Sequence, residues 1–341
     1  MNKFDELLLL SGAEREQRWL RERLETLSVR EGIALTAAIQ RTRLENAADA
    51  INCLLSLEDY MVRIDAGSYE DLGRAYIIND TVMPNTALPF MDLEQTGRYY
   101  EDQHPGLFVG DCYVKYPEKE LQPVYRGQDA PLPEDSGWSV KLRIASDAVP
   151  EGVWLRMPYC NSYGDDSSVD EELVLRELKA QDWSECALLD ARCILPQVCD
   201  FKEYFDNIKD LINCGQVLDW LLYVYGRDLP DFMERCTAVL ELENCRSLPL
   251  AMDITENLKC YDWIARTDLE ESARKSLLDL GVTEELIRTS GLDLAAYEAH
   301  LLEEDGYTPL SDGSYIRRNC EEFHYYYYHT PAPEQSGMSM Q

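Results

Sequence analysis

The apolar positions change their spacing along the chain, and the spacing predicts both helical and extended segments. Residues 12–47 carry apolar side chains at helical spacing, as at Trp19 and Leu20. Residues 138–145 instead alternate between apolar and polar side chains, which is typical of a strand with one buried face. Between them, residues 117–137 are rich in proline, glycine and charge, and this composition predicts a linker.

The helical and extended pattern occurs twice. The stretch SLEDYMVRIDAGSYEDLGRAY at 56–76 returns as NLKCYDWIARTDLEESARKSL at 257–277. Within the first, Ser68 and Asp71 have the spacing of a capping box, which predicts the start of a helix. Adding 201 to the residue numbers places the two halves in register, so that Trp19 falls on Trp220. One deletion within the second stretch then brings Arg74 onto Arg274, and the match continues beyond it. The constant offset predicts a helical module followed by an α/β module, present in two copies.

These patterns together predict an α+β fold in an elongated chain of small helical and mixed α/β modules with an internal duplication. The expected order is an N-terminal copy at 1–116 (helical at 12–47 and α/β at 48–116), a linker at 117–137, a β-rich module at 138–199, a helical module at 200–249, an α/β module at 250–319 and a flexible tail at 320–341. Such repetition suggests an extended surface more than a single enzyme cleft.

Charge narrows the range of partners. The chain has 64 acidic and 32 basic residues, a formal net charge of −32. This excess disfavours direct binding to nucleic acid or to an anionic membrane and favours a basic partner, although solubility alone would also account for it. The 11 cysteines include no CxxC pair, and no apolar run is long enough to cross a membrane. We therefore expect a cytoplasmic protein.

The chain shows no motif for catalysis or for a cofactor. Phosphate-binding loops, dinucleotide fingerprints and HExxH or GxSxG motifs are absent from the sequence. Cys320, His324 and His329 have a spacing that a metal could use, but no fourth ligand lies nearby in the sequence. We expect no enzyme activity, no cofactor and no metal. An enzyme that uses carboxylates stays open as an alternative, and it requires a concave pocket with convergent acidic groups.

The acidic residues gather at expected helix starts and turns. Duplex DNA carries one charge per about 1.7 Å of axis, so 32 net charges correspond to about 54 Å of duplex, enough for a DNA mimic. The carboxylates that we expect to act as an array are Glu58, Asp59, Glu70, Asp71, Asp165, Asp166, Asp170, Glu171, Glu172, Asp206, Asp210, Asp268, Glu270, Glu271, Glu303, Glu304 and Asp305.

Residues 138–319 resemble the ArdA antirestriction proteins of conjugative plasmids and transposons. The resemblance rests on the β-rich stretch SVKLRIASDAVPEGVWLRMP, on DLINCGQVLDWLLY, and on the region from SLPLAMDITENLKCYDW to DGSYIRRN. The chain has Ser272-Ala273-Arg274 where the family often has Leu-Gly-Arg. The N-terminal copy keeps the family-like form in DLGRAY at 71–76.

The resemblance implies an elongated, dimeric, acidic protein that imitates bent duplex DNA and occupies the DNA-binding groove of a type I restriction–modification enzyme, without catalysis. The N-terminal copy is additional to the usual family layout, which leaves open whether the chain forms a homodimer or replaces the second protomer within one chain. The alternative is an accessory or interaction protein of a conjugative element that mimics nothing, or an inhibitor of another defence system.

Overall fold

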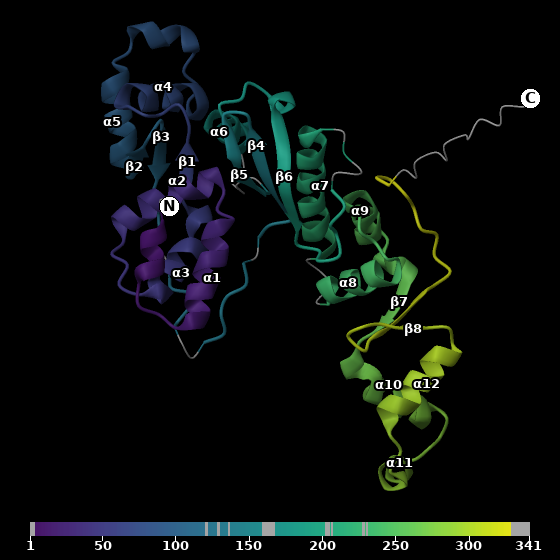
Figure 1. Ribbon diagram of the computed structural model, residues 1–341. Helices are drawn as coiled ribbons and strands as arrows, with labels where there is room; N and C mark the ends of the chain where they lie inside the picture. Colours follow the sequence, from purple (N-terminus) through teal and green to yellow (C-terminus); the bar gives the residue numbers. More distant parts are fainter. Residues whose placement is uncertain are drawn as a thin grey trace, which may run out of the picture. The chain divides into compact units, whose positions relative to one another are not determined.

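The computed structural model describes residues 4–119, 122–127, 130–135, 137–158, 168–201, 205, 207–226, 229 and 231–328. The chain divides into two compact units, Met1–Ala191 and Arg192–Gln341. Helices and small three-stranded sheets occur in both (Figure 1). The predicted α+β class and the modular construction are thus confirmed.

Unit 1 begins with a helical bundle that surrounds a hydrophobic core. The expected helix at 12–47 is broken into two helices at Ser28, whose side chain caps the second of them by accepting a hydrogen bond from the Glu31 amide. Leu20, Leu35 and Ile51 are fully buried between these helices. The elements are η1 (Asp5–Leu9), α1 (Glu14–Glu25), α2 (Val29–Arg41), α3 (Ala47–Leu55) and η2 (Leu57–Asp59).

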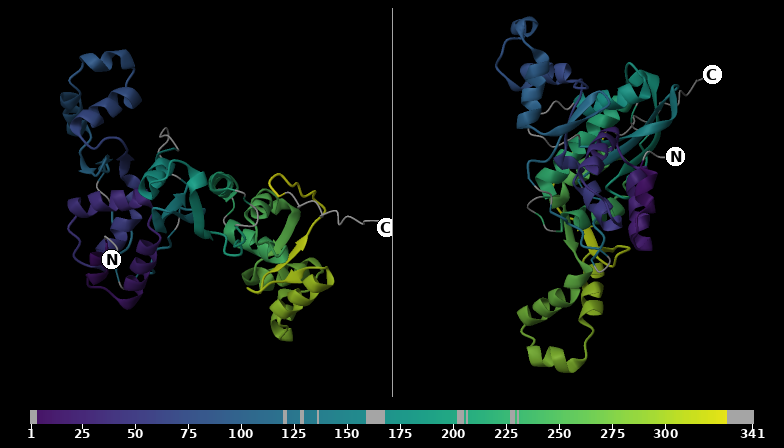
Figure 2. Two further views of the ribbon diagram at one scale, coloured as in Figure 1. Left: turned by 45° about the horizontal axis from the view of Figure 1, so that its top comes forward. Right: turned by 90° about the vertical axis from the view of Figure 1, so that its left-hand side faces the viewer.

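The α/β part of the first copy is a sheet with a pair of helices. Its antiparallel strands β1 (Met61–Arg63), β3 (Cys112–Lys115) and β2 (Gly106–Val109) lie in the order β1–β3–β2. Between β1 and β2 the chain forms α4 (Tyr69–Asp80), η3 (Asn85–Phe90) and α5 (Leu93–Gln103), which appear in blue beyond the sheet in Figure 2. Helix α4 begins where the sequence predicts it, because Ser68 accepts a hydrogen bond from the Asp71 amide.

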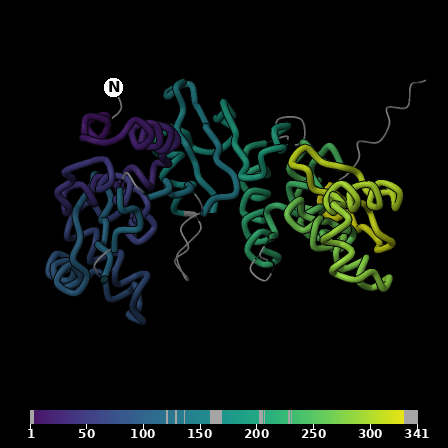
Figure 3. Tube along the Cα trace, turned by 90° about the horizontal axis from the view of Figure 1, so that it is seen from below, coloured from purple at the N-terminus to yellow at the C-terminus, as the bar shows by residue number. Residues whose placement is uncertain are grey.

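The second sheet of unit 1 packs on the helical bundle. It has the strand order β5–β4–β6, formed by Val149–Met157, Val140–Ser146 and Cys186–Cys193, and it is joined by α6 (Ser168–Leu178) and η4 (Trp183–Glu185). Lys141, expected on the polar face of its strand, is buried and donates to Thr26 at the end of α1. Figure 3 shows the teal strands of this module beside the purple N-terminal helices of unit 1. The β-rich module therefore lies with the N-terminal copy.

Unit 2 repeats the plan of the first copy. Its helical part contains α7 (Ile208–Gly226), α8 (Phe232–Leu242), α9 (Leu248–Glu256) and η5 (Leu258–Cys260). The strands β7 (Tyr261–Ile264), β9 (Tyr315–Arg318) and β8 (Thr308–Pro309) form an antiparallel sheet in the order β7–β9–β8. Between β7 and β8 lie η6 (Arg266–Asp268), α10 (Leu269–Asp279), α11 (Glu284–Ser290) and α12 (Leu294–Glu304).

The two copies agree in their elements and in the pairing of their strands. Adding 201 to the bounds of α3, η2 and α5 gives those of α9, η5 and α12. Val62 pairs with Val114 in the first sheet, and the matching Trp263 pairs with Ile316 in the second. A one-residue slip would turn every side chain to the other face, so equal register is a strong sign of a common plan. The predicted duplication is present in the backbone.

The copies extend further along the chain than we expected. The amide of Asn52 on α3 donates to the carbonyl of Tyr125 and accepts from its N–H, each at 2.8 Å. At the matching place on α9, the buried Asp253 accepts the N–H groups of Tyr326, Tyr327 and Tyr328. The described parts of the expected linker 117–137 and tail 320–341 thus pack as matching ends of the two copies, because long-range backbone hydrogen bonds hold them.

Candidate functional site

In each copy, the part of the chain that connects the two outer strands of the sheet forms a group of acidic helices. We name residues 65–104 the first acidic lobe and residues 266–305 the second acidic lobe. The first contains eight acidic and two basic side chains, and the second contains eleven and four. All but Glu101 and Glu298 of these carboxylates are exposed. Since each lobe has an acidic excess, each presents a negative surface to solvent.

Four exposed carboxylate positions are shared by both lobes. Glu70 and Asp71 in the first turn of α4 match Glu270 and Glu271 in the first turn of α10. The remaining two positions are the N-cap pair Asp92 and Asp293, and the C-terminal pair Asp102 and Glu303. Carboxylates at a helix N-terminus also stabilise the helix dipole, which explains the N-terminal positions locally. The C-terminal pair opposes the dipole and has no such local explanation.

The other predicted carboxylates fall into three groups. Several are exposed as expected, namely Glu58, Asp59, Asp210, Asp268, Glu304 and Asp305. On α6 the outcome differs: Asp170 is buried and pairs with Arg30 at 3.4 Å, Glu171 accepts from the Trp183 indole, and Glu172 pairs with Arg176. Because Asp170 lies inside unit 1, its place in an accessible array is a wrong prediction. Asp165, Asp166 and Asp206 lie outside the described residues.

The interior of the two lobes differs at one crossing point. In the first lobe Gly73 and Gly97 allow α4 and α5 to touch backbone to backbone, since a Cβ on Gly97 would lie 1.9 Å from the Tyr69 carbonyl oxygen. In the second lobe the matching residues are Ala273 and Glu298, both buried, and Ser272 donates to Glu298 at 2.5 Å. The Leu-Gly-Arg form of the first copy is therefore a packing requirement rather than a binding motif.

The tips of both lobes expose apolar side chains, which the sequence analysis missed. Phe90 is 90% exposed in the first lobe, and Leu280 is 77% exposed in the second. A few exposed apolar residues are normal, but a concentration at matching places is typical of a contact surface. The exposed tip residues are Ile78, Val82, Met83 and Phe90, and Leu278, Leu280, Leu286 and Leu292. A run of apolar residues at the expected helix ends was the available signal.

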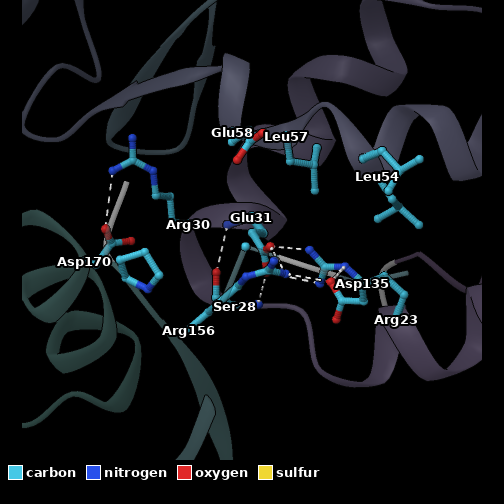
Figure 4. A pocket seen from close by; sticks show the side chains of 14 residues that line it. Arg23, Ser28, Arg30, Glu31, Leu54, Leu57, Glu58, Asp135, Arg156 and Asp170 are labelled. Carbon is cyan, nitrogen blue, oxygen red and sulfur yellow. Dashed lines mark hydrogen bonds and ion pairs between the residues drawn. The ribbon is translucent and has the colours of Figure 1, made fainter. Parts of the chain in front are cut away.

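Unit 1 also contains a buried ionic cluster beside a cavity of about 170 Å³ (Figure 4). Glu31 accepts from both Arg23 and Arg156, and Arg156 also contacts Asp135 at 3.0 Å. Lys141 approaches Asp135 from β4. The cluster therefore joins α1, α2, the segment 130–135 and the β4–β5 strands. Figure 4 shows Arg23, Glu31, Asp135 and Arg156 converging.

The electrostatics of this cluster favour a structural role. Burial alone would raise the pKa of Glu31, but Arg23 and Arg156 lower it to about 2. Burial lowers the pKa of Lys141 to about 8 against the opposing effect of Asp135, whose own pKa is lowered by Arg23, Arg156 and Lys141 despite its burial. A carboxylate with a pKa near 2 is a poor proton acceptor at neutral pH, so Glu31 is unsuited to acid–base chemistry.

Among the residues described, no group of three or more His, Cys, Asp or Glu side chains has the geometry of a metal site. His329 lies outside the described residues. Burial raises the pKa of the Cys53 and Cys236 thiols to about 12, which leaves them protonated at neutral pH. None of the described helices combines the length and apolar composition that a bilayer crossing needs.

No family model, curated protein or solved structure matches this chain. The candidate site consequently rests on the geometry alone, which consists of two acidic lobes with apolar tips.

Proposed function

We propose that the protein is a cytoplasmic, acidic DNA mimic. It inhibits a type I restriction–modification enzyme by occupying its DNA-binding groove. The observation that carries the proposal is the repetition of four exposed carboxylate positions in the two lobes. The buried glycine pair changes between the copies while these charges remain. Retained surface charge over a changed interior is what a charge-reading partner would require.

The mechanism is electrostatic and non-catalytic. Carboxylates of the lobes take the place of DNA phosphates and contact the Lys and Arg side chains that line the groove of the target. Such contacts release counterions and are screened over about 8 Å at physiological ionic strength. Binding should therefore weaken steeply as salt rises, as DNA binding to the same groove does.

Competition with DNA tests the proposal. The purified full chain is added to a type I methyltransferase core bound to a fluorescent duplex at about 50 mM salt, and displacement is measured by anisotropy. We expect displacement near stoichiometric amounts and its loss at about 200 mM salt. Absence of displacement at tenfold molar excess would contradict the proposal.

Two variants that lose the same number of negative charges distinguish the effect of the lobe carboxylates from the effect of net charge. Glu70→Gln, Asp71→Asn, Glu270→Gln and Glu271→Gln in one chain should weaken displacement at least tenfold. The control removes the same number of charges from exposed positions outside the lobes, with Glu14→Gln, Glu22→Gln, Glu25→Gln and Asp190→Asn. Equal losses in both variants would show that only net charge matters and would overturn the role of the lobes.

The apolar tips favour a second candidate, an interaction protein that does not mimic DNA. Apolar contacts depend little on salt, so binding through Phe90 and Leu280 would persist between about 50 and 200 mM salt. Phe90→Ser with Leu280→Ser would abolish such binding while leaving the carboxylates in place. Loss of DNA competition in the carboxylate variant, and not in this one, favours the mimic.

A further inference from the structure

In unit 1, the segment after the first copy lies along one face of α1. The indole N–H of Trp19 donates to the Pro133 carbonyl at 2.8 Å, and Arg15, one turn earlier, donates to the Ala130 carbonyl at 2.8 Å. Leu132 and Ala130 pack against the same core as Trp19. Residues 130–135 therefore cover a tryptophan on the outer face of the helix, and Figure 1 shows this part of the chain passing beside α1.

The sequence of this segment occurs again near the end of the chain. Residues 130–139 read APLPEDSGWS, and residues 330–339 read TPAPEQSGMS, with six of ten positions identical. The match begins a few residues after Tyr125 and Tyr326, whose N–H groups donate to the matching side chains Asn52 on α3 and Asp253 on α9. The second copy thus carries its own version of the covering segment, and this version lies outside the described residues.

The face that would receive it is open on α7. Trp220, which matches Trp19, is 55% exposed, and Tyr223 on the same face is 61% exposed. Gln216 matches Arg15, and its Nε2 is buried without a hydrogen-bond partner among the described residues. The exposed indole of Trp220 matches the Trp19 indole that donates to Pro133. The unsatisfied Gln216 amide matches the Arg15 side chain that donates to Ala130.

We propose that residues 330–335 dock on the Gln216, Trp220 and Tyr223 face of α7, as residues 130–135 dock on α1. The backbone carbonyls of the segment accept from the Gln216 amide and from the Trp220 indole. The two prolines stiffen the segment and reduce the entropy lost when it docks.

The chain can reach this face. Asp253 on α9 holds the Tyr328 amide, and α9 packs on α7. An extended chain spans about 3.3–3.6 Å per residue, so the five residues from Tyr328 to Pro333 reach about 17 Å. In the first copy, Tyr125 and Pro133 are eight residues apart, and the matching Tyr326 and Pro333 are seven residues apart. The spacing in unit 2 is therefore adequate for the same contact.

One anchor of the first copy is missing from the second. Asp135 pairs with Arg23 and Arg156 in unit 1, whereas Gln335 and Val224 occupy the positions that match Asp135 and Arg23. Docking in unit 2 consequently depends on the indole, the amide and the prolines, without an ionic contact. It should be weaker than in unit 1 and independent of salt.

The test follows the tryptophan indole N–H groups by NMR in the full chain labelled with ¹⁵N-tryptophan. The chain has six tryptophans, and Trp220→Phe assigns the signal of interest. The comparison is with a chain that ends after Tyr328. We expect Trp220 N–H exchange with water to be at least tenfold slower in the full chain, while the Trp19 signal is the same in both.

A second variant keeps the chain length. Pro331→Gly with Pro333→Gly should accelerate Trp220 exchange, and Met340→Ala, outside the matching segment, should leave it unchanged. Equal Trp220 exchange in the full and shortened chains would overturn the proposal. Protection that grows with protein concentration would also overturn it, because it would assign the segment to the α7 face of a second molecule.

Discussion

The two copies within this chain keep one backbone plan and differ in what anchors it. In the first copy Arg23 and Glu31 form a buried ion pair, whereas Val224 and the buried Phe232 occupy the matching positions in the second. Strand register and exposed carboxylates are retained in both copies. The comparison shows that the strand register and four exposed carboxylate positions are kept, while a buried polar contact is exchanged for apolar side chains.

The largest expected effect concerns the ionic anchor that only the first copy has. Glu31→Gln leaves Arg23 and Arg156 buried with a weaker partner, which should lower the stability of unit 1 by about 4 kcal/mol. The folded pKa of Glu31, about 2, is below its ordinary value of 4.5. Its contribution to stability is therefore complete above pH 4.5 and lost as the pH falls towards 2.

Hydrogen exchange resolved by residue measures this effect separately in the two units, because unfolding of two units need not be a single transition. The difference between wild type and Glu31→Gln should shrink as the pH is lowered from 5 to about 2. Amides of unit 2 serve as the internal control and should not change. A constant difference across this pH range would contradict the anchoring role of the carboxylate.

The next effect concerns the crossing of the lobe helices. Gly73→Ala places a methyl group against the Leu93 carbonyl, forces α4 and α5 apart and should cost about 3 kcal/mol. The reverse change in the second lobe, Ala273→Gly, removes one buried methyl group and adds backbone freedom, so it should cost only about 1 kcal/mol. Urea titrations followed by amide exchange in each lobe give both values. Similar costs would show that the two crossings are packed alike.

An effect smaller than that of the glycine substitution concerns the groups that hold the ends of the copies. Asp253→Asn makes the second copy resemble the first, but an amide offers one acceptor oxygen where three N–H groups require two. We expect a loss of about 2 kcal/mol and faster exchange of the Tyr326 to Tyr328 amides. Asn52→Asp is the matched variant, since it removes the donor to the Tyr125 carbonyl. Unchanged exchange in the Asp253 variant would refute its anchoring role.

Local sequence signals predicted the elements well. Ser68 and Asp71 identified the start of α4, and the alternation at 138–145 identified β4, because both signals depend on neighbouring residues. The repeat was visible because its offset is nearly constant.

Features that depend on distant partners could not be predicted in the same way. Lys141 is buried because Asp135 and Thr26 meet it, and Asp170 is buried because Arg30 does. The segments around Tyr125 and Tyr326 have the composition of loops and are held by single side chains far away in sequence. Their composition therefore resembled a linker and a tail. The spatial arrangement of the carboxylates likewise depends on packing rather than on spacing in the sequence.

The equal strand register has a consequence for engineering. Each acidic lobe is inserted between the two outer strands of its sheet. The central strand pairs with both outer strands at matching positions in the two copies. The two sheets therefore provide equivalent insertion sites for a lobe. A chimera could carry the same acidic lobe in both sheets, or a foreign segment in place of one lobe, while the sheets stay unaltered.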